Sequence, residues 1–156
     1  MKLENKIALI TGAGSGIGEA VAHLFAQEGA RLSLVDKSSE AVESTWKDLT
    51  DGGHEALRFC ADITHADKVI ELVNQTMEQW GRIDVLVNNA GGPCANDLLD
   101  MDDEQWDRDI ELNLTATARL TKAVLPHMVE QHSGAVVNIA SVNGLAAYDL
   151  MAYGAA

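Results

Sequence analysis

The chain is poor in cysteine and in basic residues, and it has no long apolar run. Its two cysteines, Cys60 and Cys94, are too few for a disulfide framework and indicate a reducing compartment, the cytoplasm. Eleven lysines and arginines against 24 acidic residues give a net charge of −13, so a nucleic-acid partner is not expected. No apolar stretch reaches the roughly 18 residues of a membrane span, and no signal-peptide pattern occurs, so neither membrane binding nor export is expected.

Metal-ligand spacings are missing as well. The five histidines form no pattern such as H-E-x-x-H, and neither cysteine belongs to a C-x-x-C pair, so no metal site is predicted. The chain has the composition of an ordinary globular protein, with 47% hydrophobic and 22% charged residues over 156 positions. We therefore interpret residues 1–156 as a single domain.

Strand-like and helix-like segments alternate along the chain, which is the pattern of a parallel sheet with helices on both faces. Strands are predicted at residues 7–10, 31–35, 55–60, 83–87 and 135–140. Helices are predicted at 19–28, from Ser38 or Ser39 to about 52, at 66–80, and from 103 to about 132. Right-handed crossovers then give a doubly wound α/β sheet, with ligands at the carboxyl ends of its strands.

Two further expectations concern these helices. Thr64 to Asp67 has the form of a capping box, and the helix behind it carries apolar residues at three- and four-residue spacing. We interpret these as a core stripe, and they are Ala66, Val69, Ile70, Val73, Met77 and Trp80. Pro126 is expected to kink or interrupt the long helix, because proline lacks the N–H of the helical ladder.

Residues 6–18 read KIALITGAGSGIG, a short apolar strand followed by a glycine-rich turn and the start of a helix. Such a turn is typical of a phosphate site, because backbone N–H groups point outward and the helix dipole favours negative charge. The common dinucleotide fingerprint G-x-G-x-x-G does not fit, since Ile17 occupies the place of its third glycine. The pattern T-G-x-x-x-G-I-G does fit, from Thr11 to Gly18.

Further motifs follow the later strands. Asp62-Ile63 comes after the third predicted strand, Asn88-Asn89-Ala90-Gly91 spells N-N-A-G after the fourth, and Ser141 and Tyr153 come after the fifth. In this order, the motifs resemble the short-chain dehydrogenase/reductase family, in particular its sugar, polyol and 3-oxoacyl reductases. The resemblance implies a Rossmann fold and a dinucleotide cofactor bound by Gly12, Ser15, Gly16, Ile17, Gly18, Asp36, Asp62, Ile63, Asn89, Ala90 and Gly91. It also implies three catalytic residues, Asn113, Ser141 and Tyr153.

Asp36 bears on the choice of cofactor. It ends the second predicted strand, about 20 residues beyond the glycine turn, where a carboxylate can accept both ribose hydroxyls of an adenosine. The same charge repels the 2′-phosphate of NADP. We therefore predict NAD, and we keep NADP as the alternative because Lys37 follows Asp36 directly.

The residues implied by the resemblance suit an NAD(P)-dependent oxidoreductase that moves a hydride between nicotinamide and a small secondary alcohol or ketone. A proton must leave or reach the alcohol oxygen, and Tyr153 can serve as the general acid or base. The hydroxyl of Ser141 can hydrogen-bond the same oxygen. In the family, the asparagine that matches Asn113 perturbs its helix and holds a water molecule. Tyr148 competes with Tyr153, but it has Ala152 at the lysine position of the family's Y-x-x-x-K motif.

The sequence departs from the family at its end. The lysine that should follow Tyr153 would be residue 157, and the sequence stops at Ala156. We therefore expect a truncated part of a longer domain, with very weak activity of its own, whose full-length form is a homo-oligomer. A dinucleotide-binding module without catalysis, or one that senses NAD, is the alternative. Cys94 is interpreted as a packing residue rather than a reactive one.

Overall fold

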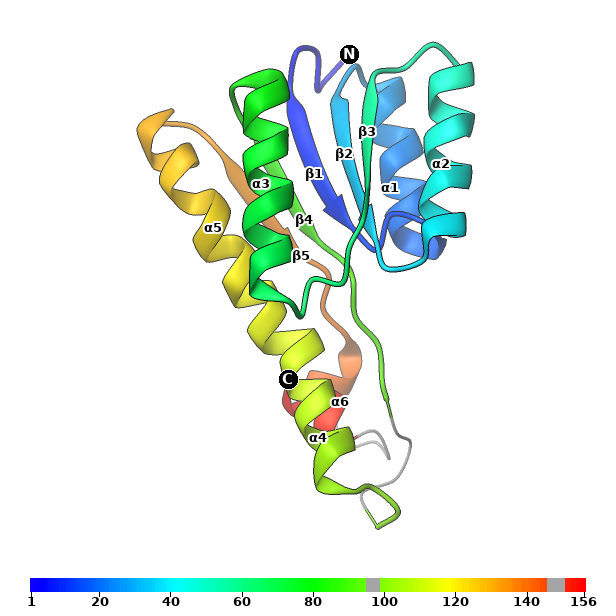
Figure 1. The fold of residues 1–156 in the computed structure, drawn as a ribbon, viewed down its shortest axis with the longest axis vertical. Helices are drawn as coiled ribbons and strands as arrows, with labels where there is room; N and C mark the ends of the chain where they lie inside the picture. The colour runs from blue at the N-terminus through cyan, green and yellow to red at the C-terminus, as the bar shows by residue number, and fades with distance from the viewer. Residues whose placement is uncertain (95–98, 146–150) are drawn as a thin grey trace.

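The computed structural model describes residues 1–94, 99–145 and 151–156 (Figure 1). Its first half contains β1 (Ile7–Thr11), α1 (Gly16–Gln27), β2 (Arg31–Asp36), α2 (Ser39–Asp51), β3 (Ala56–Cys60) and α3 (Ala66–Trp80). Its second half contains β4 (Val85–Asn88), α4 (Asp103–Ile110), a π-helical turn (Glu111–Thr115), α5 (Ala116–Glu130), β5 (Ala135–Asn138), a 3-10 turn (Val142–Gly144) and α6 (Met151–Ala155). The alternation confirms the predicted α/β class.

The five described strands form one parallel sheet in the order β3-β2-β1-β4-β5. The chain builds the sheet outward from β1 to β3, and it then returns to place β4 on the other side of β1. In doubly wound sheets of this kind, ligands bind outside the carboxyl ends of the strands at the point where the order reverses. The segments that follow β1 and β4 are therefore where a site is expected.

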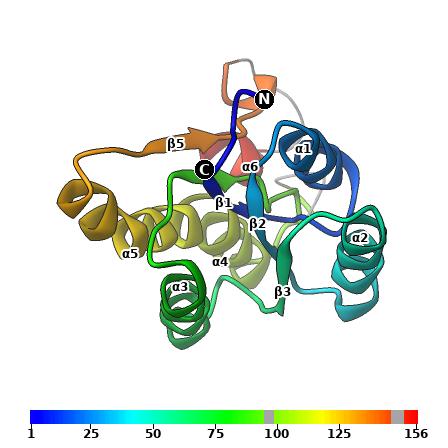
Figure 2. The same ribbon diagram turned by 90° about the horizontal axis from the view of Figure 1, so that it is seen from above.

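Helices cover both faces of the sheet, with α1 and α2 on one face and α3 and α5 on the other (Figure 2). The side chains of β1 alternate between the two layers, as the pleat of a strand requires. Ala8 and Ile10 pack in the core with α1 and α2, whereas Leu9 packs in the core with α3 and α5. All three are fully buried. The strand that leads to the carboxyl edge is therefore packed on both faces.

Helix α3 begins differently from the prediction. Its N-cap is His65, whose side chain makes no capping hydrogen bond, and the hydroxyl of Thr64 donates to Asp62 Oδ1 at 2.8 Å. The predicted capping box is therefore wrong, because a neighbouring carboxylate accepts the hydrogen bond of Thr64. The core stripe is also partly wrong, since Leu72 is buried and Ile70 is 57% exposed.

The long helix predicted from 103 to 132 is interrupted, but not where we expected. It begins with a capping box in which Asp102 and Gln105 exchange hydrogen bonds. Its α-helical pattern breaks at the π turn around Asn113 and then resumes as α5, which continues through Pro126 to Glu130. The interruption expected at Pro126 is thus wrong. Pro126 is exposed, so water can hydrate the carbonyl that loses its helical donor there.

Candidate active site at the carboxyl edge of the sheet

The glycine-rich turn joins β1 to α1 through two glycines with left-handed backbone, Gly12 at φ +63° and Gly16 at φ +56°. Helix α1 begins at Gly16, earlier than the predicted start at Glu19, and its first N–H groups have no helical acceptors. A Cβ on Gly16 would meet no heavy atom within 4 Å, so the turn opens onto free space. Gly18 lies behind the turn, where a Cβ would come within 2.1 Å of the Gly12 oxygen.

Thr11, Asn89 and Ala90 connect the glycine turn to the N-N-A-G loop after β4. The hydroxyl oxygen of Thr11 accepts hydrogen bonds from the backbone N–H groups of Asn89 and Ala90, each at 3.0 Å. In return, the side-chain amide of Asn89 donates to the Thr11 carbonyl at 2.9 Å. The sequence pattern identified Asn89 and Ala90 as site residues but not the supporting role of Thr11. The signals for Thr11 are its place at the end of β1 and at the start of the T-G-x-x-x-G-I-G pattern.

Asp36, at the end of β2, is held by backbone donors. Its Oδ2 accepts from the Gly14 N–H at 3.0 Å, and its Oδ1 accepts from the Ser38 N–H at 2.9 Å. The carboxylate therefore links the glycine turn to the start of α2. Each carboxylate oxygen has a further lone pair, so Asp36 can still accept hydrogen bonds from a ligand. Lys37 beside it is exposed.

Asp62 and Ile63 follow β3. Asp62 Oδ1 accepts from the Thr64 N–H at 3.0 Å as well as from its hydroxyl, which closes a tight turn. Partial burial disfavours the charged form of Asp62, but the hydrogen bonds from Thr64 and the positive charges of His65 and Lys37 outweigh it and lower its pKa. Asp62 is thus an anchored carboxylate, and Ile63 behind it is 4% exposed.

Asn113 lies in the π turn and holds the loop after β4. Its Oδ1 accepts from the Gly92 N–H at 2.8 Å, and its Nδ2 donates to the Gly92 carbonyl at 3.1 Å. The same Nδ2 donates to the carbonyl of Asp109 at 2.9 Å, one turn earlier. The side-chain amide therefore joins the irregular helix to the segment that follows the N-N-A-G loop.

Ser141 and Tyr153 come from the last described segments. Ser141 follows β5, and its Oγ accepts from the Asn143 N–H at 3.2 Å at the start of the 3-10 turn. Tyr153 lies on α6 and is partly buried. The competing Tyr148 lies outside the described residues. Ser141 and Tyr153 both line the cleft described next.

A single cleft of about 1020 Å³ runs along the carboxyl edge of the sheet. Thirteen predicted site residues line it, namely Gly12, Ser15, Gly16, Ile17, Asp36, Asp62, Ile63, Asn89, Ala90, Gly91, Asn113, Ser141 and Tyr153. Gly18 is not among the described lining residues, because it packs behind the glycine turn. Residues separated by more than a hundred positions in the sequence thus share one cavity.

The sequence analysis missed one polar pair in this cleft, Asn88 and Asn138. They end the adjacent strands β4 and β5, and Asn88 Nδ2 donates to Asn138 Oδ1 at 2.9 Å and to Thr121 Oγ1 at 3.1 Å. Asn88 Oδ1 is buried without a hydrogen-bond partner. The rule that ligands lie at strand ends would have pointed to both asparagines.

Cys94 is exposed, so the prediction of a packing residue is wrong. The pKa of the Cys94 thiol is raised, chiefly by desolvation. A hydrogen bond to Asp109 and the negative charge of that carboxylate raise it further. A raised pKa leaves less thiolate, which is the reactive form. Within the described ranges, no group of three histidine, cysteine or acidic side chains is placed to hold a metal ion.

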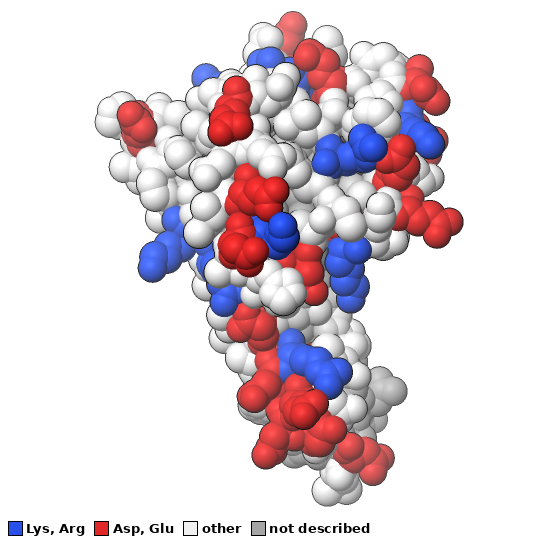
Figure 3. All heavy atoms as spheres, in the orientation of Figure 1, with Lys and Arg blue, Asp and Glu red and all other residues white. Residues whose placement is uncertain are grey.

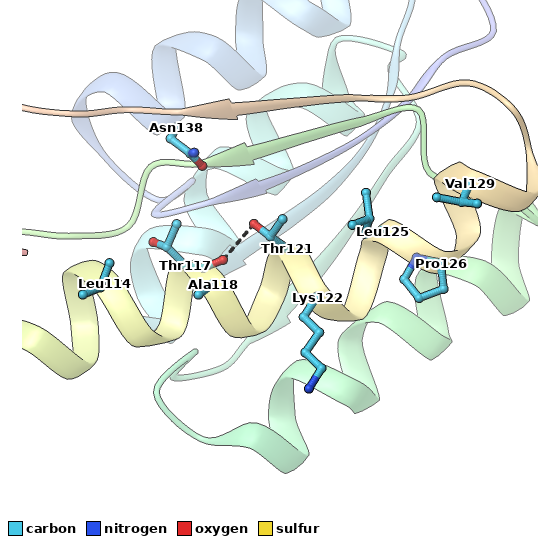
Figure 4. Close-up of a pocket in the computed structure, with 9 residues that line it drawn as sticks. All are labelled: Leu114, Thr117, Ala118, Thr121, Lys122, Leu125, Pro126, Val129 and Asn138. Carbon is cyan, nitrogen blue, oxygen red and sulfur yellow. Dashed lines mark hydrogen bonds between the residues drawn. The ribbon is translucent and has the colours of Figure 1, made fainter.

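Two other surface features carry no reactive arrangement. A groove of about 720 Å³ follows α5 and is lined by Leu114, Thr117, Ala118, Thr121, Lys122, Leu125, Pro126, Val129 and Asn138 (Figure 4). Figure 4 shows Lys122 directed away from the sheet, which leaves a mostly apolar lining.

Acidic side chains gather around α4 (Figure 3). The exposed Asp103 and Glu104 lie in its first turn, where the helix dipole favours acids.

The doubly wound parallel sheet has a glycine turn at its switch point and a cleft along its carboxyl edge. These features define a Rossmann-type α/β protein. The family model described as short chain dehydrogenase matches residues 6–156, and the chain belongs to that family. The predicted family resemblance is thereby confirmed. No described helix is both long and apolar enough to cross a membrane.

The chain is similar to enzymes of several kinds. The 3-oxoacyl-[acyl-carrier-protein] reductase FabG of Thermotoga maritima is 41% identical over 145 residues, which cover 93% of this chain and 59% of the relative. The crystal structure of NAD+-bound xylitol dehydrogenase matches with a TM-score of 0.95 at 34% identity, over 99% of this chain and 60% of that one. An actinorhodin polyketide ketoreductase with NADPH matches with a TM-score of 0.92 at 37% identity, over 96% of this chain and 59% of that one. The chain therefore spans about three fifths of the length of these relatives.

Proposed function

We propose that the chain carries the cofactor site and three catalytic side chains of an NAD(P)-dependent oxidoreductase. Its reaction would move a hydride between nicotinamide and a small secondary alcohol or ketone. The observation that carries the proposal is the cleft, which gathers the family's motif residues from the ends of successive strands. Family membership supports the same reaction class.

The described residues fit a dinucleotide. The glycine turn leaves open space above Gly16, where a pyrophosphate can approach the N–H groups of α1. Asp36 retains lone pairs for ribose hydroxyls, and Asp62 and Ile63 line the part of the cleft where adenine would lie. A cleft of about 1020 Å³ is large enough for such a ligand.

The nicotinamide ring, when bound, supplies the hydride acceptor or donor. Tyr153 would take the proton from the alcohol oxygen during oxidation and return it during reduction. The Ser141 hydroxyl would donate a hydrogen bond to the same oxygen and stabilise its developing charge. Asn113 would keep the loop at Gly92 in place and leave the π turn able to hold a water molecule in the proton relay.

We propose NAD rather than NADP as the cofactor. The Asp36 carboxylate would repel a 2′-phosphate, and it lies where ribose hydroxyls are bound in folds of this type. The solved relatives contain NAD+ in one case and NADPH in another, so family membership leaves both open. The exposed Lys37 is the residue that would favour the phosphate.

Binding constants for NADH and NADPH, measured by nicotinamide fluorescence, test the cofactor site. The unaltered chain should bind NADH more tightly, and Asp36→Ala should remove most of that preference. Asp48→Ala is the matched control, because Asp48 is an exposed acid on α2 outside the described lining of the cleft. Tighter binding of NADPH by the unaltered chain would overturn the choice of NAD, and no binding of either would overturn the dinucleotide site.

Loss of NADH absorbance with a panel of small ketones tests the catalytic proposal separately. We expect Tyr153→Phe to abolish turnover and to leave NADH binding unchanged. NADH binding without turnover on any ketone, both in this chain and in a form extended to the length of its relatives, would favour a dinucleotide-binding module without catalysis.

A further inference from the structure

Arg119 bonds to two segments that lie far apart in the sequence. It lies near the start of α5, and its Nη1 donates to the carbonyl of Thr64 at 2.7 Å and to Glu111 Oε1 at 2.8 Å. The side chains of Arg119 and Glu111 are 28% and 37% exposed, so the pair is partly removed from water. A single guanidinium therefore ties the turn after β3 to the first residue of the π turn.

Both segments lead directly into the cleft. Thr64 closes the turn of Asp62 through two hydrogen bonds to the Asp62 carboxylate, and Asp62 and Ile63 line one part of the cavity. Glu111 begins the π turn that contains Asn113, which lines another part. Arg119 itself is absent from the described lining. Any effect of Arg119 on a ligand must therefore pass through the segments that it holds.

We infer that Arg119 is a positioning residue that fixes the adenine end of the cleft by anchoring the Thr64 carbonyl to α5. This inference rests on the proposed dinucleotide site and deepens it. Glu111 orients the Arg119 guanidinium toward the Thr64 carbonyl. The turn at Asp62 then keeps the conformation to which adenosine would bind. Nucleotides that contain adenosine are the ligands whose affinity depends on this anchor.

Arginine suits the role because its planar guanidinium presents several donors and can satisfy two acceptors at once. An exposed ion pair alone would contribute little, since solvent screens it. The bond to a backbone carbonyl is what distinguishes Arg119 from Arg108, which pairs with Glu104 on the exposed surface of α4. The two arginines therefore offer a matched comparison.

The experiment measures the dissociation constant of AMP by calorimetry in the unaltered chain and in four variants. Arg119→Met removes the anchor, Arg119→Lys can restore one donor to the carbonyl, and Glu111→Gln keeps an acceptor for Arg119. Arg108→Met removes an arginine of the same kind from a pair that does not involve the turn at Asp62. Circular dichroism and cooperative thermal unfolding establish that each variant is folded.

We expect Arg119→Met to weaken AMP binding about tenfold, because the turn at Asp62 is no longer anchored and must be ordered when the nucleotide binds. Arg119→Lys should recover most of the affinity, while Glu111→Gln and Arg108→Met should stay within about twofold of the unaltered chain. An Arg119→Met variant that binds AMP normally would overturn the inference, as would an equal loss in Arg108→Met. If Arg119→Met does not fold, an Arg119→Lys variant that binds AMP tenfold more weakly than the unaltered chain overturns it. Failure of the unaltered chain to bind AMP would instead overturn the dinucleotide site itself.

Discussion

Replacing Thr11 by valine tests whether the junction between the glycine turn and the N-N-A-G loop holds the cleft together. The substitution keeps the shape of a side chain that is 1% exposed and removes only its hydroxyl. The N–H groups of Asn89 and Ala90 then lose an acceptor that lies 3.0 Å away. Leaving one buried N–H unpaired costs about 1–3 kcal/mol. Because both residues are half-buried and water can reach them in part, we expect the free energy of unfolding to fall by about 2–4 kcal/mol.

Urea unfolding measures this loss, and Thr45→Val is the matched control. Thr45 is also fully buried, but its hydroxyl donates to the Ala41 carbonyl within its own helix. Its replacement by valine leaves no N–H unpaired, so we expect a cost below about 1 kcal/mol. The Thr11 variant should also bind NADH more weakly, since Asn89 and Ala90 line the cleft. Equal losses in the two variants would refute the reasoning.

Two further substitutions test the ends of β1. Burial disfavours the charged form of Asp84, but hydrogen bonds from Arg82 and from the Ile7 N–H outweigh it and hold the pKa of Asp84 below its ordinary value. Such a carboxyl stabilises the fold above its unfolded pKa and loses this effect as the pH falls through the folded value, so stability should drop below about pH 4. Asp84→Asn should flatten that acid dependence in urea titrations, and an unchanged profile would contradict the assignment. Gly18→Ala places a Cβ 2.1 Å from the Gly12 oxygen, and overpacking of this kind costs about 1–3 kcal/mol. It should lower stability and abolish NADH binding, so a folded variant with normal affinity would count against the packing argument.

The sheet could be predicted from the sequence because its signals are local. Short apolar runs such as Ile7–Ile10 alternate with helical segments, and glycines such as Gly81 mark the ends of helices. Part of the candidate site follows from the rule that functional residues lie just after parallel strands, and the rest is implied by the family resemblance. Asp36, Asp62 and Ser141 were located in this way, and all three line the cleft.

The errors arise where a specific side-chain hydrogen bond overrides the preference of the local sequence. Thr64 has the sequence of a helix cap, but the carboxylate of Asp62 takes its hydroxyl. Pro126 is expected to kink or interrupt the long helix, but the α-helical pattern changes near Asn113 instead, where the side-chain amide bonds to Gly92 in the loop after β4. Gly92 is 21 residues from Asn113, so no periodicity or propensity reveals that partner. Asp62 is only two residues from Thr64, and there two local hydrogen-bonding arrangements compete.

The π turn at Glu111–Thr115 has a consequence for how α4 and α5 are aligned. Each residue of an α-helix advances the chain by about 100° and 1.5 Å, and a π turn contains one residue more than the α turn it replaces. Deleting one residue from this turn would restore a continuous α-helix and twist α4 by about a quarter of a revolution relative to α5. The side chain of Asn113 would then no longer point toward Gly92, and its two hydrogen bonds to that residue would be lost. The extra residue of the π turn therefore sets the rotation of α4 relative to α5. That rotation keeps Asn113 aligned with the loop after β4.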